Sequence, residues 1–316
     1  MIIVVMYRGP LRAVLAALLA LGLAAVVSGC AALTSTNHRT DGKPNLVAAF
    51  YPLQFVAQQV GGDRVSVTNL VQPGVEPHDL ELTPRQVAQV VDADAVIYLG
   101  DFQPAVDSAV TETKKRKTLD VSTVSSQRDG YVPVEEGKAR KREKGKDPHV
   151  WLDPTRMARI TDAVVKKLAA LDPAHAAEYT ANARVLDTKL ATLDSQYQVG
   201  LASCARKTIV VSHNAFGYLA ERYGLNQVSI TGLTPDQEAS ATRLAEVATY
   251  AKENGVTVIF FETLVSPKVA KVLAREVGAK AEMLDPIEGI AEHSNADYFT
   301  VMRSNLTTLR SALSCH

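Results

Sequence analysis

The chain has 316 residues, of which 47% are hydrophobic and 22% are charged. These proportions are typical of globular proteins and exclude a wholly disordered chain, and the length allows one large or two medium domains. Lysine plus arginine equals aspartate plus glutamate, at 34 each. The chain therefore lacks the basic surplus of a dedicated nucleic-acid-binding protein. Three cysteines are too few for a disulfide scaffold or a four-cysteine zinc site.

The first thirty residues have the pattern of an export signal. Arg8 and Arg12 precede an apolar run over residues 13–27, which is shorter than the roughly 20 residues that span a bilayer. The run ends in Ser-Gly-Cys30, which resembles the lipobox of bacterial lipoproteins, where the cysteine is acylated. The alternative is an ordinary signal peptide with a buried cysteine. We predict a signal peptide over residues 1–29, lipidation of Cys30 and a polar tether over residues 30–43.

Residues 44–172 are predicted to form an N-terminal α/β lobe. Short β-branched runs alternate with helical stretches, which is typical of a parallel sheet covered by helices. The predicted strands are 46–51, 65–71 and 95–99, and the predicted helices are 52–60 and 83–91. Residues 125–147 lose this pattern and are rich in charge, so we predict a mobile, solvated loop there.

Residues 173–202 are predicted to form one long helix that connects this lobe to a second one. Apolar residues recur every three or four positions over 157–171 and again from Ala183 to Leu201. A C-terminal α/β lobe follows over residues 203–316. Its predicted strands are 208–212, 228–230, 256–262 and 280–284, and its predicted helices are 215–223, 235–254, 267–277 and 297–313. The predicted fold is thus two small α/β lobes, with mostly parallel sheets, joined by a rigid helix.

Three of the seven histidines lie in loops, where binding residues concentrate. His78 lies in a turn-rich loop after a predicted strand, and His149 lies in a loop that opens a predicted helix. His213 and Asp285 each directly follow a predicted strand, and ligands of open α/β sheets bind beyond the carboxyl ends of strands. The remaining histidines have no such position: His38, His175, His293 and His316.

Three imidazoles and one carboxylate form a four-coordinate set that suits Zn²⁺. A carboxylate-rich site would suit Mn²⁺ better. His78, His149, His213 and Asp285 are therefore the candidate ligands of a metal site, two from each predicted lobe. Glu262 ends a predicted buried strand, and its role remains open: it orients a ligand imidazole, or it is a helix-capping or surface-facing residue.

Several motifs resemble the metal-binding solute receptors of bacterial zinc and manganese ABC importers. The motifs are Glu-Pro-His-Asp at 76–79, Asp-Pro-His-Val-Trp-Leu-Asp-Pro at 147–154, Ser-His-Asn-Ala-Phe-Gly-Tyr at 212–218, Phe-Phe-Glu at 260–262 and Leu-Asp-Pro at 284–286. The resemblance implies two lobes, a long backbone helix and metal between the lobes. It also implies that His78, His149 and His213 are ligands, with Asp285 as a fourth ligand or a nearby stabiliser. Histidine at position 213 resembles the zinc receptors, whereas manganese receptors usually carry glutamate there.

One departure concerns the loop over residues 125–147. Many zinc receptors have a loop before the second ligand that is rich in histidine and acidic residues. In this chain the loop contains no histidine and many lysines and arginines, which would repel a cation. Metal collection is therefore not expected of it.

The preferred function is a lipid-anchored, monomeric binding protein on the outer side of the cytoplasmic membrane. It would capture Zn²⁺ and pass it to the permease of an ABC transporter with a cytoplasmic ATPase. The alternatives are a manganese receptor of the same family and a secreted zinc hydrolase. A hydrolase would need an open metal position and a general base, and the chain has no His-Glu-x-x-His or Gly-x-Ser-x-Gly motif. We therefore do not expect an enzyme.

A disulfide between Cys204 and Cys315 is predicted. If Cys30 is acylated, two cysteines remain in an oxidising compartment. Cys204 precedes the first strand of the second lobe, and Cys315 follows its last helix. Two unpaired thiols are the alternative.

Overall fold

The computed structural model describes residues 42–125, 127–131, 142–291 and 294–316. The predicted signal peptide, Cys30 and nearly all of the tether lie outside the described residues. The chain from Pro44 to His316 forms one compact unit. Among the described residues, no helix has both the length and the apolar character needed to cross a membrane.

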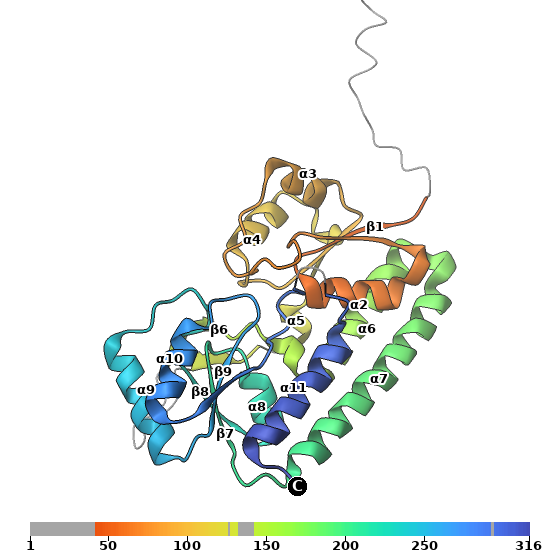
Figure 1. Ribbon diagram of the computed structural model, residues 1–316. Coiled ribbons are helices and arrows are strands. Elements are labelled where there is room, and N and C mark those ends of the chain that lie inside the picture. The colour runs from red at the N-terminus through yellow and green to blue at the C-terminus, as the bar shows by residue number, and fades with distance from the viewer. Residues whose placement is uncertain (1–41, 126, 132–141, 292–293) are drawn as a thin grey trace, which may run out of the picture. The chain divides into compact units, whose positions relative to one another are not determined.

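The N-terminal lobe is built on a parallel sheet with the strand order β2–β1–β3–β4. The strands are β1 (Asn45–Ala48), β2 (Ser66–Asn69), β3 (Ala95–Tyr98) and β4 (Thr118–Asp120). The helices of this lobe are α2 (Tyr51–Gly61), α3 (Pro84–Asp92), α4 (Pro104–Thr111) and the short α5 (Ser122–Ser125) (Figure 1). The three predicted strands and two predicted helices are present, whereas α4 and β4 were not predicted.

The C-terminal lobe repeats this topology with the order β10–β9–β7–β8, again all parallel. Its strands are β7 (Thr208–Val211), β8 (Asn226–Ser229), β9 (Val258–Phe261) and β10 (Lys280–Met283). Its helices are α8 (Gly217–Tyr223), α9 (Ala241–Glu253), α10 (Lys268–Val277) and α11 (Tyr298–Leu313). In both lobes the first and third strands are neighbours, with the second outside the first. The predicted α/β fold class is confirmed.

Helix α9 begins later than predicted. We predicted a helix from residue 235, but α9 starts at Ala241. Ser240 is the N-cap, and its side chain accepts a hydrogen bond from the backbone N–H of Arg243. Since a serine cap satisfies an otherwise unpaired amide, it sets the start of the helix more strongly than the upstream proline does.

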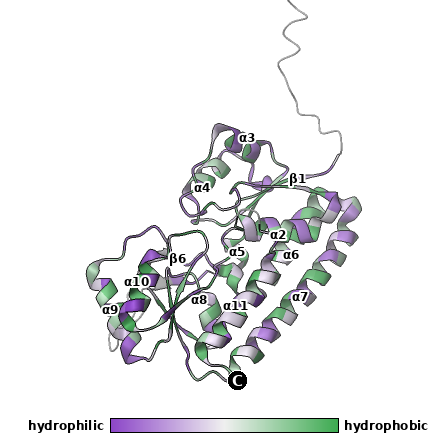
Figure 2. Ribbon diagram, viewed as in Figure 1, coloured by the Kyte–Doolittle hydropathy of each residue, from purple (hydrophilic) through white to green (hydrophobic). Residues whose placement is uncertain are grey.

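Two long helices lie between the lobes in sequence, α6 (Pro154–Leu171) and α7 (Ala176–Ala202). They pack against each other, and α2 and α11 pack against α7. Helix α7 has 27 residues and is about 40 Å long at 1.5 Å per residue. Its buried positions follow one stripe, and Figure 2 shows hydrophobic and hydrophilic residues alternating around it. Short 3₁₀ turns complete the chain: Gly62–Arg64, Lys115–Lys117, Val150–Leu152 and Pro173–His175.

The main hydrophobic core is continuous through both lobes and the long helices. It includes Trp151, Tyr197 and Phe216, all almost fully buried. A second, smaller core covers the other face of the C-terminal sheet, where α9 and α10 contribute Val247 and Leu273. Continuity of the main core means that the lobes are not independent folding units held by one helix.

Part of the predicted mobile loop over residues 125–147 is ordered, which corrects that prediction. Strands β5 (Asp129–Tyr131) and β6 (Arg142–Lys146) form an antiparallel ribbon. The Lys146 ammonium pairs with the Asp129 carboxylate at 2.5 Å. Charge alone predicted a solvated segment, but backbone pairing and this ion pair hold its two ends together.

The predicted disulfide is present in the structure. Cys204 follows α7, and Cys315 follows α11, with a sequence separation of 111 residues. The bridge therefore ties the C-terminal helix to the start of the C-terminal lobe.

Candidate metal centre

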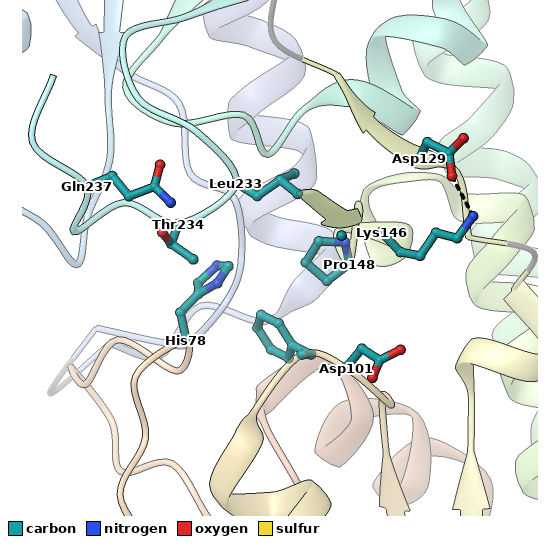
Figure 3. Close-up of a pocket in the computed structure, with 10 residues that line it drawn as sticks. His78, Asp101, Asp129, Lys146, Pro148, Leu233, Thr234 and Gln237 are labelled. Atoms are coloured by element: carbon teal, nitrogen blue, oxygen red, sulfur yellow. Dashed lines mark hydrogen bonds and ion pairs between the residues drawn. The ribbon is translucent and has the colours of Figure 1, made fainter. Parts of the chain in front are cut away.

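A partly open cavity of about 600 Å³ leads to the imidazole of His78 (Figure 3). Asp101 lines it from the N-terminal lobe, Thr234 lines it from the C-terminal lobe, and Lys146 lines it from the β5–β6 ribbon. His149 and His213 do not line the cavity, and both are fully buried. The three histidines thus lie at the inner side of this cavity, between the lobes.

Strand ends in the C-terminal parallel sheet place two polar groups of the centre. His213 lies just beyond β7 and Glu262 just beyond β9, the two adjacent strands at which the strand order of the C-terminal sheet reverses. Such a reversal leaves a crevice where ligands of open α/β sheets bind. His78 comes from the loop after β2, and His149 comes from the segment that follows β6.

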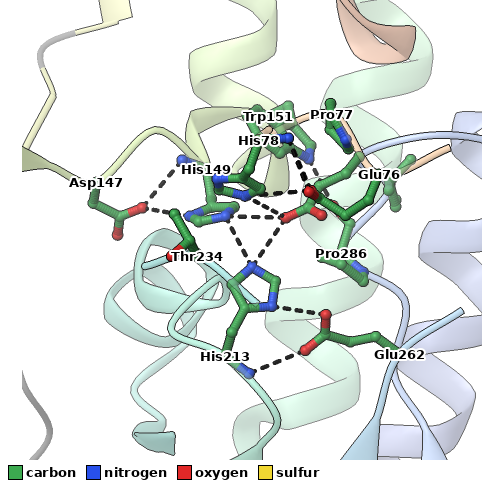
Figure 4. Close-up of polar contacts among 12 residues, drawn as sticks. Glu76, Pro77, His78, Asp147, His149, Trp151, His213, Thr234, Glu262 and Pro286 are labelled. Atoms are coloured by element: carbon green, nitrogen blue, oxygen red, sulfur yellow. Dashed lines mark hydrogen bonds and ion pairs between the residues drawn. The ribbon is translucent and has the colours of Figure 1, made fainter. Parts of the chain in front are cut away.

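The three predicted histidines converge on one carboxylate oxygen that the sequence did not single out. Glu288 Oε1 lies 3.0 Å from His213 Nε2, 3.1 Å from His149 Nε2 and 3.3 Å from His78 Nε2. Figure 4 shows the imidazoles of His78, His149 and His213 gathered at this point. The Nε2 atoms of His149 and His213 are 3.1 Å apart. All four side chains are buried, and they form a group that could hold a metal ion.

These separations match the edges of a tetrahedral metal site. Zinc bonds of 2.0–2.2 Å to nitrogen and oxygen place the ligand atoms of a tetrahedron about 3.3 Å apart. The measured separations of 3.0–3.3 Å are close to that value and need only a small expansion. Four of the six separations between the ligand atoms are thus close to the tetrahedral value, and all four atoms lie within 4.8 Å of one another, so these residues could hold one four-coordinate cation.

Two carboxylates select the ring nitrogens that face this centre. Asp147 Oδ1 lies 2.9 Å from His149 Nδ1, and Glu262 Oε2 lies 2.7 Å from His213 Nδ1. Because an ionised carboxylate only accepts hydrogen bonds, each Nδ1 donates its proton outward and each Nε2 is the atom available to a metal. Glu262 also accepts from the backbone N–H of His213 at 3.1 Å. The contact of Glu262 with His213 Nδ1 is the one that a residue orienting a ligand imidazole would make.

The electrostatics of the centre favour a bound cation. Burial opposes a charged imidazole at His213, but Glu262 and Glu288 outweigh it and raise the pKa of His213 well above its usual value. Burial likewise opposes charge at His149, where hydrogen bonds to Asp147 and Glu288 raise the pKa.

Two further groups of the centre shift the other way. Burial lowers the pKa of His78. Burial also disfavours the Glu288 carboxylate, but the neighbouring imidazoles of His213 and His78 outweigh it and hold its pKa well below the usual range. Without metal, an ionised Glu288 thus shares protons with imidazoles, and a divalent cation can replace those protons.

Asp285 does not join the group, which corrects the predicted ligand set. Its Oδ1 accepts from the backbone N–H of Ile287 at 2.7 Å, and its Oδ2 accepts from the Thr263 hydroxyl at 3.2 Å. Burial raises the pKa of Asp285 to about 6. Its carboxylate therefore shapes the loop that carries Glu288.

The Glu288 loop is further held by the backbone and by Trp151. Ile287 has φ 57°, in the left-handed region that a β-branched residue rarely adopts. The indole N–H of Trp151 donates to the carbonyl of Pro286 at 2.7 Å. Since Trp151 follows His149 by two residues, this bond links a loop of one lobe to the loop that presents Glu288. The sequence carried one signal for Glu288, a second carboxylate in the loop after the last strand.

A second acidic group lies near His78 and consists of Glu76, Asp79 and Asp236. Burial and the charge of Glu288 raise the pKa of Glu76 to about 8, and both its oxygens accept from the backbone N–H of His78. A hydrogen bond with Asp79 raises the pKa of Asp236, and both residues are exposed. With a pKa of about 8, the Glu76 carboxyl group is mostly protonated at pH 7, so it adds little negative charge beside His78 in the metal-free protein.

Comparison with known proteins places these features in one family. The family model "Zinc-uptake complex component A periplasmic" (ZnuA) matches residues 46–312. The zinc-binding protein AdcA of Streptococcus pyogenes serotype M6 is 38% identical over 291 residues, a match that covers 85% of this chain and 56% of that protein. This chain therefore spans little more than half the length of that relative.

Two further relatives match over nearly their whole length. The high-affinity zinc uptake system protein ZnuA of Bacillus subtilis is 34% identical, and the match covers 89% of this chain and 92% of that protein. The solved Zn(II)-bound ZnuA-like domain of Streptococcus pneumoniae AdcA is 35% identical, with a TM-score of 0.71. That match covers 86% of this chain and 99% of the domain.

Proposed function

We propose, from the premise that this chain belongs to the family of zinc-uptake complex component A proteins, that it captures Zn²⁺ outside the cytoplasmic membrane and delivers it to an ABC importer. The resemblance seen in the sequence motifs is confirmed by the family match. The partners would be a membrane permease and its cytoplasmic ATPase. The proposed ligands are His78, His149, His213 and Glu288.

One observation carries the choice of metal: three imidazole nitrogens face a single carboxylate oxygen at tetrahedral separations. Imidazole-rich four-coordinate sites suit zinc, whereas manganese favours octahedral sites rich in oxygen ligands. The donor set therefore supports zinc over the manganese alternative.

The same geometry supports a binding protein over a zinc hydrolase. A catalytic zinc keeps one coordination position open for water. Here Glu288 would fill the fourth position, and the carboxylates of Asp147 and Glu262 already accept from ligand imidazoles. A closed shell holds a cation and leaves no place for an activated water.

We also propose that the protein is anchored by lipid at Cys30 and acts as a monomer on the outer face of the membrane. Two curated relatives from Streptococcus pneumoniae are named zinc-binding lipoproteins. Cys30→Ala should move the protein from the membrane fraction to the soluble fraction. Retention in the membrane, with residues 1–29 still attached, would contradict the anchor.

Competitive calorimetry on metal-stripped protein tests the metal assignment. Zinc should bind with a stoichiometry of one and more tightly than manganese, because imidazole ligands follow the Irving–Williams order. Alanine at His78, His149 or His213 should remove most zinc binding, and His213→Glu should narrow the preference for zinc. Equal or tighter manganese binding by the wild type would refute zinc, and undiminished binding in all three alanine variants would refute the site.

A further inference from the structure

We infer that Arg128, from the charged segment next to the β5–β6 ribbon, is a positioning residue of the metal centre: it fixes the imidazole of His149 through Asp147 and holds that imidazole against the loop of His213. The inference rests on the proposed function, because the positioned imidazole is a proposed zinc ligand. It gives this charged segment a role other than metal collection.

Arg128 and His149 contact opposite oxygens of one buried carboxylate. The Nε atom of Arg128 lies 3.6 Å from Asp147 Oδ2, while Asp147 Oδ1 accepts from His149 Nδ1 at 2.9 Å and from the His149 backbone N–H at 3.1 Å. The Asp147 side chain is 2% exposed. A buried carboxylate held between a guanidinium and an imidazole has one preferred orientation, so its Oδ1 points at the ring in a fixed direction.

The guanidinium is itself held by the opposite lobe. Its Nη1 donates to the carbonyl of Gly217 at 2.6 Å and to Glu221 Oε2 at 3.2 Å, and both residues belong to α8. Gly217 follows His213 by four residues. Arg128 thus contacts the segment of His149 on one side and the helix behind His213 on the other.

Tyr218 repeats this link through the backbone. Its hydroxyl accepts from the Arg128 backbone N–H at 2.8 Å and donates to the Asp147 carbonyl at 2.8 Å. The Asp147 backbone N–H in turn donates to the Arg128 carbonyl at 3.0 Å. Main chain and side chain of Arg128 therefore both hold Asp147 next to α8.

The close approach at Gly217 shows that the junction is tightly packed. A Cβ atom at this position would lie 2.7 Å from Asp147 Oδ2 and 3.1 Å from Arg128 Cζ. Both distances are shorter than ordinary van der Waals contacts. A side chain here would displace the carboxylate that orients His149, which is the physical reason for a glycine.

Arg128→Ala tests the inference against Arg206→Ala as a matched control. Arg206 is also partly buried, and it donates to Gly255 O and to Ser314 Oγ away from the centre. Competition with a chelating dye should show zinc affinity about tenfold weaker in Arg128→Ala, the lower end for residues that orient a metal ligand. The control should bind as the wild type does. Unchanged affinity in Arg128→Ala, or an equal loss in the control, would overturn the inference.

A double-mutant cycle shows whether Arg128 acts through Asp147. Asp147→Asn alone should weaken zinc binding by about 10–100-fold. Adding Arg128→Ala to it should cause little further loss, because the two residues act on one ring. Independent losses that multiply would refute the link. Arg128→Lys keeps the charge but loses the planar guanidinium, so it should lose part of the zinc affinity that Arg128→Ala loses. It replaces the alanine variant if that variant does not fold.

Proton NMR of the metal-free protein separates this inference from the proposed function. The Nδ1–H proton of His149 should give a resonance protected by its hydrogen bond to Asp147 in the wild type. Arg128→Ala should broaden or remove that resonance, and Arg206→Ala should not. An unchanged resonance would overturn the positioning role even if zinc binds. Failure of the wild type to bind zinc would instead refute the proposed function, while the resonance would still decide the role of Arg128.

Discussion

Replacement of Glu288 by glutamine tests the fourth ligand directly. Glu288→Gln keeps the size of the side chain and removes the charge on the oxygen that lies 3.0–3.3 Å from three imidazoles. The matched control is Asp285→Asn, which keeps an oxygen to accept from the backbone N–H of Ile287. The sequence favoured Asp285 as the ligand and the structure favours Glu288, so the two variants separate the alternatives.

The magnitude follows from ligand linkage. Zinc at a thousandfold excess over Kd raises the free energy of unfolding by about 4.1 kcal/mol. For a protein of this size that amounts to a melting-temperature rise on the order of 10 °C. Loss of residues that merely orient a ligand weakens metal affinity by about 10–100-fold, so loss of a ligand charge should reach at least the upper limit. At the same zinc concentration, a 100-fold weaker Kd leaves about 1.4 kcal/mol.

Thermal unfolding with and without zinc is the assay, with calorimetry to obtain Kd. Glu288→Gln should lose most of the zinc-dependent rise in melting temperature, while Asp285→Asn should keep most of it. The metal-free melting temperatures show whether either variant damages the fold. If Asp285→Asn abolished the rise and Glu288→Gln preserved it, the assignment of the fourth ligand to Glu288 would be wrong.

Three further predictions concern protons, ligand orientation and the disulfide. The raised pKa values of His149 and His213 stabilise the metal-free fold at low pH, and this contribution is lost as pH rises through those values. Because zinc displaces these protons, zinc binding should release protons and become tighter as pH rises. Calorimetry at neutral pH should then show binding enthalpies that depend on the buffer. pH-independent affinity between pH 6 and 8 would contradict this. Glu262→Gln should weaken zinc binding by about 10–100-fold, measured by dye competition, and should lower metal-free stability at low pH, because Glu262 helps to raise the pKa of His213. Reduction of the Cys204–Cys315 bridge should lower the free energy of unfolding by up to about 4–5 kcal/mol in denaturant titrations, and identical curves with and without reductant would argue against a stabilising role.

The amino-acid sequence by itself determined most of the elements and three of the residues at the centre. Strands and helices were predicted from hydrophobic periodicity, which is a local property of the sequence. Every predicted strand is present in the structure. His213 could be placed because it follows a buried strand directly, and the position of a strand end in a parallel sheet follows from the strand itself. The pairing of Cys204 with Cys315 followed from counting cysteines.

Only the tertiary structure decided which carboxylate completes the centre and what holds its ligands. Asp285 lies just beyond β10, close to where it was predicted, but it turns its carboxylate back to the N–H of Ile287. The left-handed backbone at Ile287 then directs Glu288 inward, and no periodic pattern encodes such a turn. Arg128 lies beside Asp147 because β5 and β6 pair, and both residues contact α8, about 90 residues further along the chain from Arg128. Contacts between residues so far apart in the sequence depend on how whole helices and strands pack. The backbone of each element sets the direction in which its side chains point, and local sequence patterns do not show which side chains will meet.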